Sequence, residues 1–117
     1  MQISELLKAM ETELGNEPHV MKLLSKLRED AVFEHANNKN FAMSGEHIPP
    51  KYKLLMSIAL SAVLGDSNCT ETYTRVARRK GISIDEIMEA ILLARFIKSA
   101  TVVSTAAKSM EFLLEEK

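Results

Sequence analysis

One residue of this 117-residue chain, Cys69, combines a nucleophilic side chain with a position that favours reactivity. It follows the turn-like segment 65–68 and falls in the first turn of a predicted helix. Unpaired N–H groups and the positive end of the helix dipole stabilise a thiolate there and lower its pKa. Asp66 and Glu71 act in the opposite direction, because nearby negative charge raises a thiol pKa. The alternative is a buried, unreactive Cys69 that packs as a small hydrophobic residue.

Other residue types offer weaker signals. No two histidines stand three or four residues apart, the spacing with which one helix holds a metal ion; they are His19, His35 and His47. We therefore expect packing or solvated roles for them, and neither a metal nor another cofactor. A basic cluster ends one predicted helix, where cations complement the helix dipole, although an anion site is an alternative. Its members are Arg75, Arg78, Arg79 and Lys80.

The composition excludes several classes of protein. Fifteen basic and sixteen acidic side chains give a net charge of -1, which removes any bulk electrostatic case for nucleic acid or an anionic membrane. A single cysteine cannot form an internal disulfide. The longest apolar stretch, 54–64, is too short to span a bilayer. The first ten residues lack the features of a signal peptide, so we expect a soluble, cytoplasmic protein.

Apolar residues repeat with helical spacing, and no strand-like alternation is visible. The spacing predicts a first helix over 3–14 that ends at Gly15, and a second from Pro18 towards His35. A polar break is expected at 37–40, followed by an irregular stretch. Few glycines, prolines and aromatic residues also disfavour a β-sandwich or barrel, because those folds need many turns. We therefore predict an all-α fold in a single compact domain of about six helices.

The later helices carry clearer boundary signals. The third is expected from Pro50 to Leu64 and is apolar on nearly all sides, which predicts burial by its own fold or by another subunit. The fourth runs from a cap at 66–67 to Lys80. A capping box of the S-x-x-E type at 83–86 opens the fifth. Small residues beyond position 99 predict a kink, and a final helix then ends near position 116.

Residues 48–114 resemble the carboxymuconolactone decarboxylase and alkylhydroperoxidase D family. The resemblance lies in a buried helix (KYKLLMSIALSAVLG), a short turn to a cysteine, and the sequence RVARRKGISIDEIMEAILLA. Its most recognisable positions are Ala77, Gly81, Ser83, Asp85, Glu86, Ile87, Glu89 and Ala90. It implies one alkylhydroperoxidase D-like domain over 1–117, with N-terminal helices in 1–47 and the family core in 48–116.

The resemblance also implies a candidate site. Peroxidase members of the family carry a C-x-x-C motif, a histidine four residues after the second cysteine, and a glutamate on the preceding helix. Matched without gaps, the second cysteine is Cys69 and the first is replaced by Asp66. Tyr73 stands at the histidine position and Leu54 at the glutamate position. The implied catalytic residues are therefore Cys69, Asp66 and Tyr73, and one of the four family positions is kept.

These replacements leave three hypotheses for function. Cys69 reduces peroxides, as an antioxidant oxidoreductase, and an external thiol or the Cys69 of a neighbouring subunit resolves its sulfenic acid. Alternatively, the protein is a lyase of the decarboxylase type that uses Tyr73, Asp66 or a histidine. The third hypothesis is a non-catalytic member that binds small molecules or serves in assembly. Leu54 cannot accept a proton, and Tyr73, with an ordinary pKa of about 10, is a poor base at neutral pH.

The resemblance further implies assembly, because members of the family form symmetric oligomers, commonly trimers or hexamers. The nearly all-apolar third helix and the small-residue segment suit such an assembly, since 117 residues have difficulty burying both. We therefore expect a homo-oligomer with a small-molecule substrate and an external thiol reductant. We expect no nucleic-acid partner and no membrane.

Overall fold

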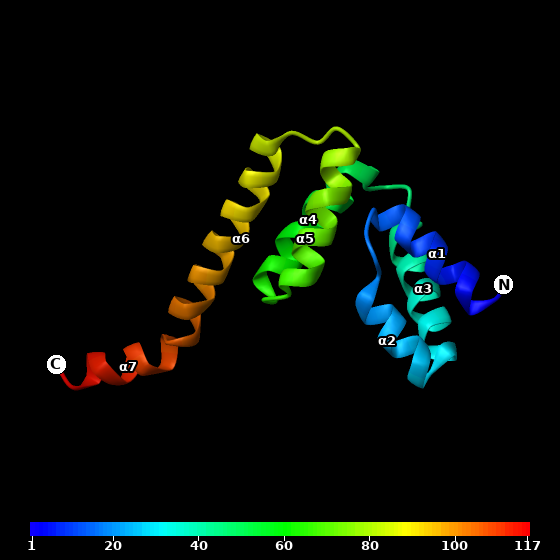
Figure 1. Ribbon diagram of the computed structural model, residues 1–117. Coiled ribbons are helices and arrows are strands. Elements are labelled where there is room, and N and C mark those ends of the chain that lie inside the picture. The colour runs from blue at the N-terminus through cyan, green and yellow to red at the C-terminus, as the bar shows by residue number, and fades with distance from the viewer.

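The computed structural model describes all 117 residues and contains seven helices and no strand (Figure 1). This confirms the all-α prediction, with one helix more than expected. The helices are α1 (Ile3–Leu14), α2 (His19–Leu27), α3 (Glu29–Met43), α4 (Pro50–Val63), α5 (Ser67–Arg79), α6 (Ile84–Thr105) and α7 (Ala107–Glu115). None of them combines the length and apolar character needed to cross a membrane.

The additional helix arises in the N-terminal half of the chain. The predicted second helix stops at Leu27, because Arg28 adopts an extended conformation and α3 begins directly after it. The polar break predicted at 37–40 is wrong, since α3 continues through these residues to Met43. Tertiary contacts outweigh their weak helix propensity: Val32 is fully buried, and Lys39 pairs with Glu13 of α1 at 2.6 Å.

The kink predicted near position 99 is also wrong. Helix α6 runs without interruption to Thr105, and the change of direction comes at Ala106. The hydroxyls of Ser99 and Thr101 donate to carbonyls three residues earlier, which is compatible with a continuous helix. The capping box at the start of α6 is confirmed, with Ser83 and Glu86 each bonding the other's backbone N–H.

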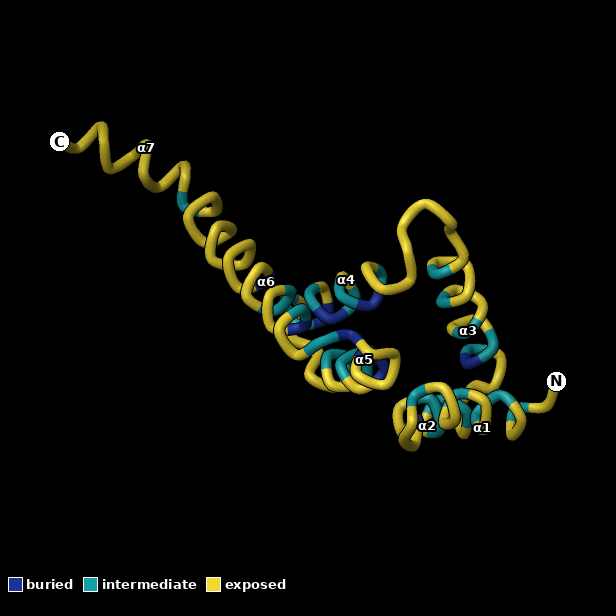
Figure 2. Tube along the Cα trace, turned by 90° about the horizontal axis from the view of Figure 1, so that it is seen from above, coloured by how far each residue is buried: buried dark blue, intermediate teal, exposed yellow.

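The core lies where α4, α5 and the first half of α6 meet (Figure 2). Helices α4 and α5 are joined by a tight turn in which Gly65 has a φ of 77°, and Gly81 leaves α5 with a φ of 85°. Both values lie in the left-handed region, which glycine enters without strain. The buried cluster consists of Leu54, Ile58, Val76, Ala77, Ile82 and Ile87.

The single subunit is not compact, contrary to the prediction. Its extents are 66 × 35 × 26 Å, and its radius of gyration of 18.7 Å exceeds the roughly 13 Å of a compact domain of this length. Its accessible surface of 8958 Å² exceeds by about 2,600 Å² that of a compact monomer of equal mass. The second half of α6 and α7 project from the body as an arm (Figures 1 and 2).

Candidate functional site

Cys69 lies in the first turn of α5, as predicted, and Asp66 caps that helix. The Asp66 carboxylate accepts a hydrogen bond of 3.0 Å from the backbone N–H of Cys69. A short polar residue at this position satisfies one of the N–H groups that a helix start leaves unpaired. The candidate thiol and its acidic neighbour are therefore held together by the cap of one helix.

The surroundings of the thiol oppose its ionisation. Partial burial raises the pKa of Cys69, and the adjacent Asp66 carboxylate raises it further. The bond from the Cys69 N–H lowers the pKa of Asp66, so the carboxylate stays charged beside the sulfur. The expected stabilisation by the helix start is thus outweighed.

Tyr73 lies one helical turn after Cys69, where residues four apart share a face of the helix. It is half-buried and packs against the core cluster. Burial raises the pKa of Tyr73, and the negative charges of Cys69, Glu13 and Asp66 add to this effect. Its phenol is therefore a hydrogen-bond donor in this setting and cannot serve as a base near neutral pH.

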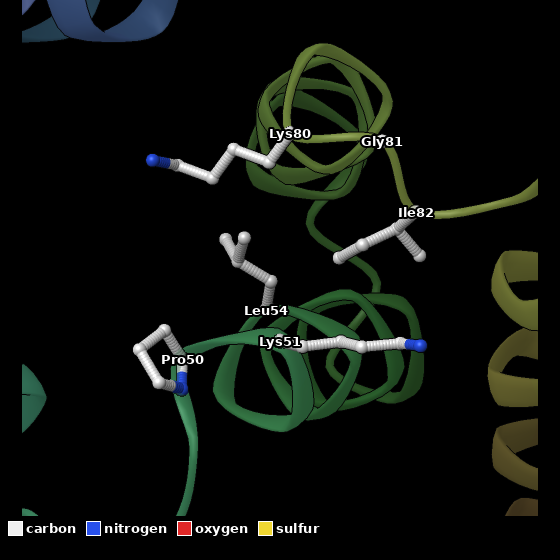
Figure 3. A pocket seen from close by; sticks show the side chains of 6 residues that line it. All are labelled: Pro50, Lys51, Leu54, Lys80, Gly81 and Ile82. Carbon is white, nitrogen blue, oxygen red and sulfur yellow. The ribbon is translucent and has the colours of Figure 1, made fainter.

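Leu54 is buried in the core, with only 8% of its surface exposed. It also lines an open hollow of about 350 Å³ with Pro50, Lys51, Lys80, Gly81 and Ile82 (Figure 3). The amino groups of Lys51 and Lys80 extend in opposite directions, and Lys51 pairs with Glu86 at 2.5 Å. The structure thus brings Cys69, Asp66 and Tyr73 together on α5, whereas Leu54 contributes packing and no proton transfer.

One polar residue beside the site was missed in the sequence. Ser61 of α4 is buried, and the Thr70 hydroxyl donates to its Oγ at 3.0 Å. Ser61 in turn donates to the Ser57 carbonyl at 2.8 Å. This chain of hydroxyls joins α4 to the residue that follows Cys69. A serine inside an otherwise apolar helix was the signal that could have revealed it.

A second open hollow, of about 400 Å³, lies at the turn between α4 and α5. Asp66 and Thr70 line it, together with Ala62, Gly65, Ser67 and Glu71. Neither of the two hollows is lined by Cys69 or Tyr73. No group of three or more His, Cys, Asp or Glu side chains is arranged to hold a metal ion.

The chain is all-α, and its cysteine lies in the first turn of the helix that follows the largely apolar helix α4. Residues 18–111 match the carboxymuconolactone decarboxylase family, and the chain belongs to this family. The match covers α2 to α6 and extends into α7. Among curated proteins, none matches the chain.

Proposed function

We propose that the protein reduces peroxides slowly through Cys69, as the one reactive thiol of a homo-oligomeric family member. The observation that carries this proposal is the half-buried thiol in the first turn of α5, with Asp66 and Tyr73 on either side of it along the helix. Membership of the carboxymuconolactone decarboxylase family supports it, because the peroxidase members that the sequence resembles carry a cysteine at the position of Cys69.

The proposed cycle begins when the thiol loses its proton to solvent. The thiolate sulfur of Cys69 attacks one peroxide oxygen, so that an S–O bond forms and the O–O bond breaks. The departing oxygen takes up a proton and leaves as water or an alcohol, and the sulfur, oxidised by two electrons, becomes a sulfenic acid. An external low-molecular-weight thiol then forms a mixed disulfide and releases water. A second thiol displaces Cys69 as the free thiol and leaves as the external disulfide.

The electrostatics of the site determine the expected rate of peroxide reduction. The thiolate is the nucleophile, and a raised pKa keeps its population small at neutral pH. The turnover is therefore expected to be slow at neutral pH and to increase as the pH rises. A supply of reduced thiol is needed for the second half of the cycle, which fits a cytoplasmic location.

The test is peroxide consumption by the purified protein with an excess of a small thiol, at about pH 7 and about pH 9, above the ordinary thiol pKa. We expect more consumption at the higher pH and sulfenic acid at Cys69 after exposure to peroxide alone. The matched control is Cys69→Ser, which keeps the size of the side chain and should be inactive. Activity of the wild type no greater than that of Cys69→Ser at both pH values would overturn the proposal.

A second candidate is a non-catalytic family member that binds a small molecule. The burial of Leu54 at the family glutamate position favours it, because no proton relay remains there. A ligand at 100 times its dissociation constant raises the free energy of unfolding by about 2.7 kcal/mol. A thermal shift with lactones or carboxylates, together with an unreactive Cys69, would favour this function. A thermal shift with one of these compounds that is accompanied by its conversion to a product would instead indicate the decarboxylase-type lyase.

We also propose a homo-oligomer, a trimer or hexamer by the resemblance to the family. The excess of about 2,600 Å² of accessible surface over a compact monomer supports assembly. Light scattering at micromolar concentration measures the mass directly, and a mass of 13.1 kDa would contradict the proposal.

A further inference from the structure

The arm formed by residues 95–117 has almost no partner within its own chain. Every residue in it except Ala106 is exposed, although it carries several large apolar side chains. A helix as short as α7 is marginally stable in water unless an apolar face is packed. Residues 95–105 extend α6 well beyond its last buried residue, Ala94. The arm therefore needs a surface on another molecule.

Helix α6 has two apolar faces. Ile87 and Ala94 lie on the face that packs against the subunit's own core. Leu92, Phe96 and Val103 lie on the opposite face at helical spacing and are all exposed, Phe96 by 63%. Because a helix that is apolar on opposite sides is normally buried on both, the second face of α6 is expected to be covered.

Helix α4 repeats this arrangement. Leu54 and Ile58 face the core, whereas Tyr52, Met56 and Leu60 form an exposed ridge at intervals of four residues on the other side. The ridge is about 12 Å long along the helix axis, and the stripe from Phe96 to Val103 is about 10 Å long. The two exposed surfaces thus match in length and in apolar character.

We propose that the arm of one subunit, residues 95–117, packs on the α4 ridge of a second copy of this chain. The amount of surface favours a copy over an unrelated partner. The excess of about 2,600 Å² on each chain amounts to about 5,200 Å² for two chains, which lies within the 2,000–5,000 Å² or more that obligate homo-oligomers bury in total. One contact, repeated by symmetry, covers both the arm and the ridge on every subunit. In a dimer the two subunits exchange arms, and in a ring each subunit places its arm on the ridge of the next.

This inference rests on the proposed homo-oligomer and adds the surface that builds it. Phe96→Asp and Leu60→Lys each place a charge at the proposed contact, whereas Lys98→Glu changes a charge on the other side of α6 and serves as the control. Light scattering is expected to show dissociation of the first two variants towards the 13.1 kDa subunit, and an unchanged mass for the control. Circular dichroism checks that the helices are retained.

A disulfide experiment locates the contact even where a charged variant fails to fold. Two variants are made in a Cys69→Ser background, one with Met56→Cys and one with Phe96→Cys. The two proteins are mixed so that their subunits exchange, and the mixture is then mildly oxidised. A covalent dimer with one chain of each kind is expected in excess over dimers of a single kind. Dimers that join only two copies of Phe96→Cys would overturn the proposal in favour of contact between arms. An oligomer that survives both charged variants would overturn this inference and leave the proposed oligomer standing, whereas a monomeric wild type would overturn both.

Discussion

The carboxylate of Asp66 accepts a hydrogen bond of 3.0 Å from the backbone N–H of Cys69, and its charge adds to the burial that raises the pKa of the Cys69 thiol. One residue therefore stabilises the start of α5 and suppresses the nucleophile of the same turn. The C-x-x-C motif of the peroxidase members has its first cysteine where Asp66 stands, and a neutral thiol there would carry no fixed negative charge. The reactivity of Cys69 thus depends on a residue whose main local task is to cap a helix.

Removing this charge should activate the thiol. In Asp66→Asn the amide oxygen still caps the helix, since asparagine is as good an N-cap as aspartate. We expect a lower pKa of Cys69 and faster alkylation by iodoacetamide at neutral pH than in the wild type. Asp66→Ala also removes the charge but loses the cap, which costs about 1 kcal/mol of stability. An alkylation–pH profile of Asp66→Asn that coincides with that of the wild type would refute this account.

The side chain at position 73 should control whether the site has a base. Tyr73→His places an imidazole, with an ordinary pKa of about 6.5, one turn from the thiol. We expect faster peroxide reduction at neutral pH, because the imidazole accepts the thiol proton. Tyr73→Phe, the control, keeps the packing against the core and should leave the rate near that of the wild type. A large loss in Tyr73→Phe would mean that the phenol takes part directly.

Ile58 tests the core that holds α4 against α5. Its side chain is fully buried, so Ile58→Ala should lower the free energy of unfolding by about 2–5 kcal/mol. Ile58→Val removes one methylene group and should cost about 0.5–1.5 kcal/mol. Urea unfolding of the wild type and the two variants measures these differences in the free energy of unfolding. Equal effects of the two substitutions would show that the packing around this residue is looser than described.

Gly81 tests the backbone between α5 and α6. Its φ of 85° is unfavourable for other residues, and a Cβ there would meet no atom within 4 Å. Gly81→Ala should therefore cost about 1–2 kcal/mol through backbone strain alone. Gly45 has no positive φ, and its Cβ would be in ordinary contact with Lys53, so Gly45→Ala is the matched control and should be nearly neutral.

Glu86 should contribute to acid sensitivity. The ion pair with Lys51 and the bonds from Ser83 lower its pKa from 4.5 to about 2. A carboxyl whose pKa is lower in the folded state stabilises the fold fully above its unfolded pKa and loses this contribution as the pH falls. We expect the contribution to disappear between pH 4.5 and about 2. In Glu86→Gln the free energy of unfolding should fall less steeply with decreasing pH in this range. A pH dependence equal to that of the wild type would argue against the ion pair.

Local signals in the sequence were sufficient for much of the fold. The capping box at Ser83 and Glu86, the glycine at 81 and the apolar spacing of α4 depend on neighbours within a few residues. Such signals predicted the all-α class, most helix boundaries and the position of Cys69 in the first turn of α5. They failed at positions 37–40 and 99, where weak local preferences were outweighed by contacts with α1 and by the continuity of a long helix.

The chemistry of the site was decided by tertiary structure. The sequence alone showed two opposing influences on the Cys69 thiol, and partial burial together with the position of the Asp66 carboxylate decided that its pKa rises. Leu54 became a core residue because α5 and α6 cover it, and the Ser61–Thr70 bond formed because α4 and α5 meet. The charge of Asp66 is local to the start of α5, whereas burial depends on residues distant in sequence and emerges only when the helices are packed together.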